Sequence, residues 1–433
     1  MIYQEALQWI HTRERFGIKP GLERMEYLLK GLGNPHQGLK VIHIGGSNGK
    51  GSTAAFTASL LKAAGYKVGL YTSPYLKAFS NRMVVDGVEV GEETLISLVE
   101  RIKPLVEAAS GAEPGPPTEF EVVTAMAFLY FAKAGVDYLV LEVGLGGRLD
   151  ATNVVENPLV SVITNISLEH TAVLGNTIKE IAREKAGIIK EGVPVVTSAQ
   201  NSEALEVIEV AAGKKKAPLF IAGRDYFFKA GDAGLRGQYF SYQGRETNYQ
   251  DLFIPLLGRH QLDNAAAALA SLEAAGLKTK DKDIRQGFKD TSWPGRFEIL
   301  KHDPPVVIDA AHNPAAARRL REALADYFPG KGIVLVLGIL GDKAVKEFLT
   351  ELIPAARLVI LTRAMHPTRA QDPEETAVLA RGLTSNPVIV VDSLREALLT
   401  AGNRTLPGEA VCISGSFYTI SEARRLLTEE KII

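Results

Sequence analysis

The chain has 433 residues, of which 46% are apolar and 23% charged, and its formal net charge is −1. This length favours two or three domains, and this composition supports an apolar core without disulfides or a structural metal. The charge balance excludes the excess of Lys and Arg on which non-specific nucleic-acid binding depends. We therefore expect small-molecule partners and no nucleic acid.

The N-terminal segment and the single cysteine, Cys412, indicate where the protein works. One cysteine excludes an intrachain disulfide, which fits a reducing compartment. The first residues lack the apolar core of a secretion signal. The longest apolar stretch, around 122–132, is well short of the ~20 residues that a membrane span needs. We expect a cytoplasmic protein with no membrane partner.

Apolar runs alternate with helical patterns through the N-terminal half of the chain. A predicted strand at 39–44 is followed by a Gly-rich turn and by a predicted helix at 52–64, which Gly65 ends. Short apolar runs bounded by polar residues are typical of a parallel sheet that is buried on both faces. Such runs predict further strands at 68–71, 138–143, 159–166 and 193–197. The alternation indicates an α/β fold.

The pattern changes twice in the rest of the chain. Short aromatic runs separated by Gly-rich turns predict a small antiparallel sheet within 218–257, and an Ala-rich helix follows at 262–275. The segment 291–296, with Pro and Gly, predicts a hinge. Beyond it, four helical segments alternate with predicted strands at 306–308, 333–337, 358–362, 388–391 and 410–414. We therefore predict two domains, 1–295 and 296–433, the second a smaller doubly wound α/β domain.

Residues 45–52 read GGSNGKGS, between a predicted strand and a predicted helix. Glycines let backbone N–H groups face phosphates, and the helix N-terminus adds the positive end of its dipole. Lys50 would then reach the β- and γ-phosphates, and Ser52 would offer its hydroxyl to Mg²⁺ or phosphate. The standard phosphate loop has Gly at position 44 and Ser or Thr at 51, where this chain has Ile44 and Gly51. A Gly-rich turn without a ligand is the alternative, and the glycine spacing argues against a dinucleotide loop.

Three charged or titratable side chains follow this loop in the sequence. Glu142 lies near the end of a predicted strand, where ligands of open α/β sheets bind and where a carboxylate can hold Mg²⁺. A lone acid there is more often structural, but the following GLGGRLDATN adds glycines that allow close approach to a ligand. His170 follows the next predicted strand, with an ordinary surface histidine as the alternative. Lys185 lies on a helix predicted to begin near 177, where lysines are normally solvated.

Longer motifs occur in order along nearly the whole chain. They include GLERM at 21–25, GGSNGKGS at 45–52, TSPYL at 72–76, TEFEVVTAMAF at 118–128, LEVGLGGRLDATNV at 141–154, ITNISLEH at 163–170, GRHQLDNAAAA at 258–268, WPGRFE at 293–298, IDAAHNP at 308–314, GDK at 341–343 and SGSFY at 414–418. With these motifs the chain resembles the folylpolyglutamate synthase family, including bifunctional dihydrofolate synthases, of the Mur ligase superfamily. The resemblance implies an N-terminal P-loop ATPase domain and a C-terminal α/β domain.

The resemblance also implies an activity. Such an enzyme joins L-glutamate to the γ-carboxylate of folate, including tetrahydrofolate, or of folylpolyglutamate. The reaction uses ATP and passes through an acyl phosphate, and bifunctional members also use dihydropteroate. The family implies two Mg²⁺ sites, admits a monovalent cation and suggests a monomer.

The resemblance assigns residues to each part of the site. It implies catalytic roles for Lys50, His170, Lys185 and His312, with Lys185 carbamylated. The implied Mg²⁺ ligands are Ser52, Ser73, Glu142, His170 and the modified Lys185. The implied ATP site comprises Ser47, Asn48, Gly49, Lys50, Gly51, Ser52, Asn264, Arg296 and Asp309. The implied pteridine pocket comprises Thr118, Glu119, Phe120, Glu121, Leu149, Asp150 and Ala151, and Ser416 with His312 would build the glutamate side.

The chain departs from the family pattern at a few positions. Tyr75 stands where the family usually has His, Glu169 where it has Asp, and Asn81-Arg82-Met83 where it has Glu-Arg-Ile. The family's DGAHNP is DAAHNP here. Tyr75 and residues 78–83 fall where the resemblance places a folate-gating loop, so they bear on substrate preference.

Two alternatives to this reading stay open. One is a Mur-type ligase for UDP-muramoyl substrates, which usually has a separate N-terminal UDP-binding domain; the 44 residues before the loop leave no room for one. The other is an ATP-gated binding or scaffold protein with no ligase activity.

Overall fold

The computed structural model describes residues 1–17, 19–111, 113–341 and 344–432, so Asp342 and Lys343 of the GDK motif lie outside the described residues. The chain divides into two compact units. The first comprises Met1–Lys229, Phe240–Leu252 and Asp263–Thr291. The second comprises Ala230–Tyr239, Phe253–Leu262 and Ser292–Ile433.

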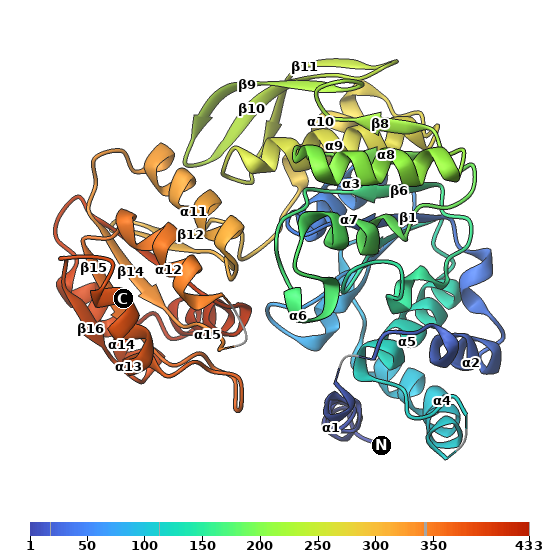
Figure 1. The fold of residues 1–433 in the computed structure, drawn as a ribbon, viewed down its shortest axis with the longest axis horizontal. Coiled ribbons are helices and arrows are strands. Elements are labelled where there is room, and N and C mark those ends of the chain that lie inside the picture. Colours follow the sequence, from blue (N-terminus) through green and yellow to red (C-terminus); the bar gives the residue numbers. More distant parts are fainter. Residues whose placement is uncertain (18, 112, 342–343, 433) are drawn as a thin grey trace. The chain divides into compact units, whose positions relative to one another are not determined.

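An eight-stranded sheet organises the first unit (Figure 1). Its strand order is β4-β3-β2-β5-β1-β6-β7-β8. Neighbours from β2 to β8 pair in parallel, whereas β3 and β4 form an antiparallel edge. The strands are β1 Val41–Gly45, β2 Val68–Tyr71, β3 Met83–Val85, β4 Val88–Glu89, β5 Tyr138–Glu142, β6 Val160–Ile163, β7 Val195–Thr197 and β8 Leu219–Ile221. Because β5 and β6 flank β1 on opposite sides, the end of β1 lies at a topological switch point, where α/β sheets bind ligands.

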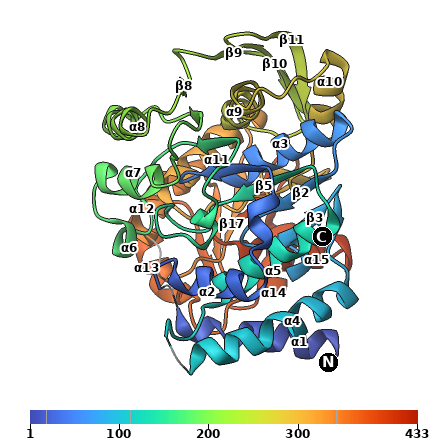
Figure 2. The same cartoon turned by 90° about the vertical axis from the view of Figure 1, so that its right-hand side faces the viewer.

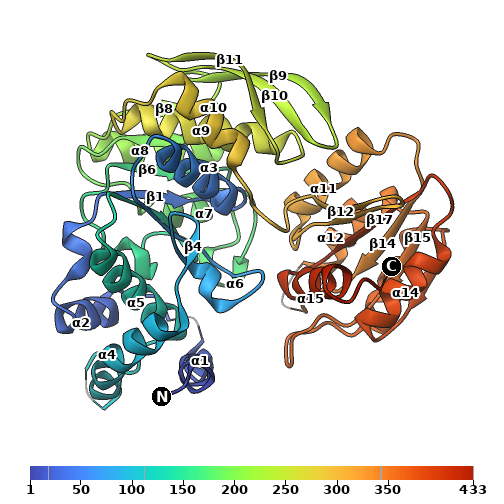
Figure 3. The ribbon, with the colours of Figure 1, turned by 180° about the vertical axis from the view of Figure 1, so that it is seen from behind.

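Helices complete the first unit. The helices α1, α2, α4 and α5 gather in one group, on which Figures 1, 2 and 3 agree, and α3 packs against β1, β2 and β5. The helices are α1 Tyr3–His11, α2 Glu23–Gly31, α3 Lys50–Ala63, α4 Glu92–Ser110, α5 Glu119–Ala134, α6 Thr171–Leu174, α7 Ile178–Ala186, α8 Ser202–Lys214 and α10 Asp281–Asp290, with most of α9 His260–Ala274.

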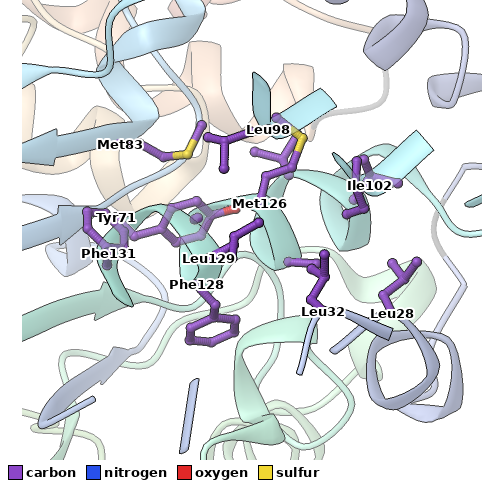
Figure 4. Close-up of a cluster of buried hydrophobic side chains, with 14 of the residues drawn as sticks. Leu28, Leu32, Tyr71, Met83, Leu98, Ile102, Met126, Phe128, Leu129 and Phe131 are labelled. Carbon is purple, nitrogen blue, oxygen red and sulfur yellow. The ribbon is translucent and has the colours of Figure 1, made fainter. Parts of the chain in front are cut away.

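A large apolar cluster joins the α1, α2, α4 and α5 group to the sheet. Alternate strand residues such as Leu139 and Leu141 belong to it, as the two-residue period of a strand requires. Figure 4 shows Tyr71, Met126 and Phe131 pointing into this cluster. The Tyr71 hydroxyl, although buried, hydrogen-bonds Thr124 at 2.9 Å. The ends of β2 and β5 are therefore packed on an apolar core in which the Tyr71 hydroxyl has a hydrogen-bond partner.

The second unit contains a six-stranded sheet in the order β12-β13-β17-β14-β15-β16. Only β12 pairs antiparallel, as an edge strand beside β13. The strands are β12 Glu298–His302, β13 Pro305–Ile308, β14 Ile333–Leu337, β15 Leu358–Leu361, β16 Val388–Val390 and β17 Ala410–Ser414. The helices are α11 Pro314–Tyr327, α12 Val345–Leu352, α13 Pro373–Arg381, α14 Leu394–Arg404 and α15 Phe417–Thr428.

A separate three-stranded sheet has the order β11-β10-β9, with β9 Phe227–Gly234, β10 Gly237–Gln243 and β11 Asn248–Ile254. Two residues join β9 to β10, a connection that requires antiparallel strands. The predicted fold class, a mostly parallel sheet with a small antiparallel sheet and a smaller C-terminal α/β domain, is therefore confirmed.

Several local predictions differ from the structure. The helix predicted at 52–64 begins at Lys50, and the strand predicted at 159–166 ends at Ile163. The short strands β3, β4, β8 and β12 were not predicted, because strands of two to five residues have little periodicity of their own. In the described residues, every helix is too short or too polar for a membrane span.

Candidate active site

The GGSNGKGS segment runs from the last residue of β1, through a tight turn, into the first residues of α3. A neighbouring segment beyond β6 braces it: Ser47 donates its backbone N–H to Asn165 O at 2.8 Å, and Asn48 donates to Asn165 Oδ1 at 2.9 Å. The Thr164 hydroxyl donates to Asn48 O at 2.8 Å, and Ser167 N–H donates to Ser47 Oγ at 3.0 Å. The backbone N–H groups of Ser47 and Asn48 are thus already used in hydrogen bonds within the protein. Donors for a phosphate come instead from the first turn of α3, which has no intrahelical acceptors for them.

Lys50 is the first residue of α3 and arches back over the loop. Its ammonium group donates to Gly46 O at 2.9 Å and to Ser47 O at 3.0 Å. Gly51 and Ser52 follow it in the same turn, and Ser52 is buried. A flexible ammonium, a helix N-terminus and a hydroxyl therefore occur together at the end of β1.

Gly49 caps α3 in the left-handed conformation, with φ 91° and ψ −11°. A Cβ atom at this position would lie 2.3 Å from Oδ1 of Asn264, a residue of α9. The loop and α9 are therefore in contact at a point where only glycine fits. This contact brings together two residues of the predicted ATP site that are far apart in sequence.

We expect Gly49→Ala to weaken nucleotide binding by displacing Asn264 or the loop. The left-handed backbone adds a stability cost of about 1–2 kcal/mol. Gly65→Ala is a matched control, because Gly65 has the same φ of 91° at the other end of α3 but nothing within 4 Å of its added Cβ. Affinity for a non-hydrolysable ATP analogue and the unfolding temperature check this. Equal loss of affinity in both variants would contradict a specific role for the Gly49–Asn264 contact.

Glu142 and Ser73 meet at the carboxyl edge of the sheet. Glu142 is the last residue of β5, and its Oε2 accepts a hydrogen bond from Ser73 N–H at 2.9 Å, just beyond β2. Because β5 pairs with β1, this buried carboxylate lies beside the strand that leads into the phosphate loop. Within the described part of the chain, three or more His, Cys, Asp or Glu side chains gather nowhere in a metal-binding cluster. A cation at this edge would thus depend on hydroxyl, water and phosphate oxygens in addition to Glu142.

His170 lies farther from a strand than the sequence indicated. It comes seven residues after Ile163, the end of β6, and has a left-handed φ of 47° as the residue before α6. Its backbone conformation is uncommon for a non-glycine residue. The structure thus puts His170 in a loop beyond the sheet edge, next to Glu169 in sequence.

Lys185 is almost completely buried, with 1% of its side chain exposed. Its ammonium group donates to Glu169 Oε1 at 2.7 Å and to Gly46 O at 2.8 Å, which ties α7 to the phosphate loop. Burial lowers the pKa of Lys185 from its usual value, and attraction to Glu169 opposes that shift. Burial alone would raise the pKa of Glu169, but the charges of Lys185 and Lys50 outweigh it and lower that pKa to about 2. The general expectation of a solvated lysine is therefore wrong here.

The segment 118–121 forms the N-terminus of α5. Thr118 and Glu121 form a capping box in which Thr118 N–H donates to Glu121 Oε2 at 2.7 Å. Arg24 of α2 donates through Nε to both Glu121 oxygens, at 2.9 and 3.1 Å. Sequence reasoning missed Arg24, although its GLERM motif was a signal. The structure thus joins α2 to the predicted pteridine pocket.

Two glycines of the loop after β5 lie in close contact with neighbouring elements. A Cβ at Gly144 would lie 2.3 Å from the Phe120 ring, and one at Gly147 would lie 2.8 Å from Glu184 O of α7. These two glycines therefore permit close packing within the protein, and the prediction that the glycines of this loop allow a ligand to approach stays a prediction. The Gly144 contact nevertheless brings Phe120 next to the loop that carries Leu149, Asp150 and Ala151.

Asp150 organises that loop. Its carboxylate accepts hydrogen bonds from Leu145 N–H at 2.8 Å and from Thr152 N–H at 3.0 Å. Burial raises the pKa of Asp150 in spite of these donors. A hydrogen-bond donor of a pteridine could therefore use only the lone pairs of the Asp150 carboxylate that Leu145 and Thr152 leave free.

The remaining predicted residues lie in the second unit. Arg296 stacks on Phe417, with its Cζ 4.8 Å from the ring centre, and the His312 ring lies 5.8 Å from the same ring. Asp309 is buried at the end of β13 and accepts hydrogen bonds from Phe297 N–H and Ala311 N–H, each at 2.8 Å. Ser416 caps α15. Arg296 and His312 thus both contact Phe417, the residue that follows Ser416.

Comparison with known proteins agrees with this arrangement. Residues 44–272 match the Mur ligase middle domain, and residues 295–417 match the Mur ligase glutamate ligase domain. The chain belongs to the Mur ligase family. It is accordingly an ATP-dependent ligase of the amide-bond-forming class.

Similar proteins place this Mur ligase among the folylpolyglutamate synthases. It is 41% identical to the dihydrofolate synthase/folylpolyglutamate synthase of Bacillus subtilis, over 98% of this chain and 99% of the relative. Its structure resembles folylpolyglutamate synthase of Thermotoga maritima, with a TM-score of 0.87, 41% identity and coverage of 100% and 98% of the two chains. It also resembles the Mycobacterium tuberculosis folylpolyglutamate synthase solved with ADP and AMPPCP, with a TM-score of 0.92, 36% identity and coverage of 98% and 99%.

Proposed function

We propose that this Mur ligase joins L-glutamate to the γ-carboxylate of folate or folylpolyglutamate, and to the carboxylate of dihydropteroate, with consumption of ATP. One observation carries the proposal: the phosphate loop, Glu142 and the Phe120–Gly144 contact all occur where β1 and its neighbour β5 end. Parallel strands bring their carboxyl ends to one edge of the sheet. A nucleotide site and an aromatic substrate site can therefore share that edge.

The residues fit a triphosphate. The first turn of α3 offers backbone N–H groups, and Lys50 already reaches over the loop to Gly46 and Ser47. In the proposed reaction the γ-phosphoryl group passes from ATP to the acceptor carboxylate, giving ADP and an acyl phosphate. The glutamate amine then attacks the acyl carbon, phosphate leaves, and the amine loses a proton as the amide forms. Lys50 would offset charge on the transferring group.

The chemistry of the donor set also fits magnesium, which prefers oxygen ligands and retains several waters. Ser73 and Glu142 are already joined by a hydrogen bond, and we assign the Ser52 hydroxyl to the same ion. His170 would add a nitrogen ligand, and this assignment rests on the resemblance alone. Bound magnesium would supply charge neutralisation for the phosphates. We also propose a second magnesium ion and a monovalent cation, which only the family resemblance supports.

We retain the proposal that Lys185 is carbamylated in the active enzyme. The neutral amine attacks CO₂ and loses a proton, so the lowered pKa of Lys185 favours the reaction. The product would place a second anion beside Glu169, which now pairs with the ammonium at 2.7 Å. Carbamylation therefore requires a compensating cation at this point, which links the modification to metal binding.

The remaining assignments follow the same scheme. Thr118–Glu121 and 149–151, with Arg24 added, would line the pteridine pocket; Asn264, Arg296 and Asp309 would contact ATP; His312 and Ser416 would serve glutamate. We place the domain boundary at 295/296. The glutamate ligase match begins at residue 295, and the long C-terminal segment of the second unit begins at Ser292. We further propose a cytoplasmic monomer, on the resemblance and the single cysteine.

ADP release tests the proposed function. With Mg-ATP present, we expect release only when both L-glutamate and an acceptor are added, with one ADP for each glutamate incorporated. Comparing dihydropteroate with tetrahydrofolate separates the two activities. Phosphate release that needs neither substrate would indicate a simple NTPase, and turnover only with a UDP-muramoyl acceptor would favour the other Mur-type reading.

A further inference from the structure

Arg82 carries a buried guanidinium group that the preceding assignments do not use. It ends the 3₁₀ turn Phe79–Arg82, and only 11% of its side chain is exposed. Its Cζ lies 5.5 Å from the ring centres of both Tyr75 and Phe79. The guanidinium is therefore held between two aromatic side chains inside the first unit.

The hydrogen-bonding capacity of this guanidinium is largely unused. Nε and Nη1 are both buried and have no hydrogen-bond partner among the described residues. The nearest carboxylate oxygen, Glu119 Oε1, is 3.6 Å from Nη1, and Glu119 also lies 3.5 Å from His11 Nδ1. A buried donor without an acceptor costs about 1–3 kcal/mol. Arginine binds planar carboxylates especially well, so these donors suit a carboxylate ligand.

The turn that presents Arg82 is fixed by its own side chains. Asn81 Oδ1 accepts hydrogen bonds from Lys77 N–H at 2.9 Å and Ala78 N–H at 3.2 Å. Ser80 Oγ and the Asn81 amide both donate to Glu89. Asn81, one of the departures from the family pattern, thus builds the turn. Arg82 is consequently presented by an ordered segment.

Two contacts locate Arg82 within the proposed site. Its carbonyl accepts a hydrogen bond from Thr72 N–H at 3.2 Å, so its backbone adjoins the segment that leads into Ser73. Its side chain approaches Glu119, the residue before Phe120 on α5. Arg82 therefore lies between the proposed metal end of the site and the proposed pteridine pocket. The carboxylate of a pteroyl acceptor must occupy that interval to receive a phosphoryl group.

We propose that Arg82 binds and orients the acceptor carboxylate through Nε and Nη1, which have no hydrogen-bond partner among the described residues, and so makes the site specific for pteroyl acids over neutral pteroyl compounds. This rests on the proposed function. The competing explanation is that Arg82 only holds Tyr75 and Phe79 together through cation–π contacts. If Arg82 only holds the two rings together, replacing it should weaken the binding of charged and neutral ligands equally. If Arg82 recognises the carboxylate, replacing it should weaken the binding of the charged ligand alone.

Binding of pteroate and of pteroamide, in which a carboxamide replaces the carboxylate, separates these explanations. We expect the wild-type protein to bind pteroate roughly 10- to 100-fold more tightly, the difference associated with a hydrogen bond to a charged group. In Arg82→Gln that preference should fall to about twofold or less, with little change in pteroamide affinity. Lys77→Gln removes an exposed positive charge from the same turn and should keep the wild-type preference.

Thermal unfolding of each variant accompanies the titrations. If Arg82→Gln does not fold, Arg82→Lys keeps the charge but loses the planar donor fork, and should retain part of the preference. A folded Arg82 variant with the full wild-type preference, or equal weakening of both ligands, would overturn the proposal. If wild-type protein ligates glutamate to pteroyl acceptors while these results fail, only the role of Arg82 is lost. If wild-type protein neither binds pteroate nor ligates glutamate, the proposed function itself is wrong.

Discussion

Replacing Lys50 by alanine is expected to reduce ATP-dependent ligation by on the order of 100- to 1,000-fold. The reason is electrostatic: Lys50 begins α3 and is the ammonium group that arches over the phosphate loop. During phosphoryl transfer it would lie against the charge that moves from ATP to the acceptor. ADP release with saturating glutamate and acceptor measures the effect.

The fold should tolerate this change. The Lys50 hydrogen bonds go to two loop carbonyls, and each bond contributes about 1 kcal/mol. Lys62→Ala is the control, because Lys62 is exposed on the same helix and donates only to Asp86 O among the bonds described. Turnover within a few-fold of wild type in a folded Lys50→Ala protein would remove the phosphate-loop assignment.

Replacing Lys185 by methionine is expected to abolish ligation and to destabilise the protein by about 3–5 kcal/mol, because it leaves the buried Glu169 without its partner. The double variant Lys185→Met/Glu169→Gln should recover much of the stability, since neither charge then remains. Activity should stay absent in both variants. Urea unfolding and the ADP-release assay measure the two quantities separately. An active double variant would show that Lys185 serves only the fold.

The pH dependence of stability gives a second test of the ion pair between Lys185 and Glu169. The pKa of Glu169 is lowered to about 2 from its ordinary 4.5. A carboxylate with a lowered folded-state pKa stabilises the fold above its unfolded pKa and loses that contribution as pH falls toward its folded pKa. The stability of the wild type relative to the double variant should therefore fall by about 3 kcal/mol between pH 4.5 and pH 2, whatever its value at neutral pH. If the difference in unfolding free energy between the wild type and the double variant stays constant across this range, the ion pair does not lower the pKa of Glu169.

The amino-acid sequence was sufficient for the features that depend on neighbouring residues. Apolar runs, glycine turns and helix patterns predicted the main strands of both units, and GGSNGKGS between β1 and α3 indicated a phosphate loop. Ordered motifs along the chain indicated the family. Glu142 could be placed because its position depends only on the strand that it ends.

Only the tertiary structure decided which distant side chains meet. The phosphate loop is braced by Asn165, packed against Asn264 and tied to Lys185, and none of these partners is adjacent to it in sequence. The same is true of Arg24 with Glu121. Periodicity shows which face of an element is apolar, but not which element will cover it. The burial that pairs Lys185 with Glu169 and leaves Arg82 with unused donors arises when the helices pack on the sheet, so it follows from the packing and not from the spacing of residues along the chain.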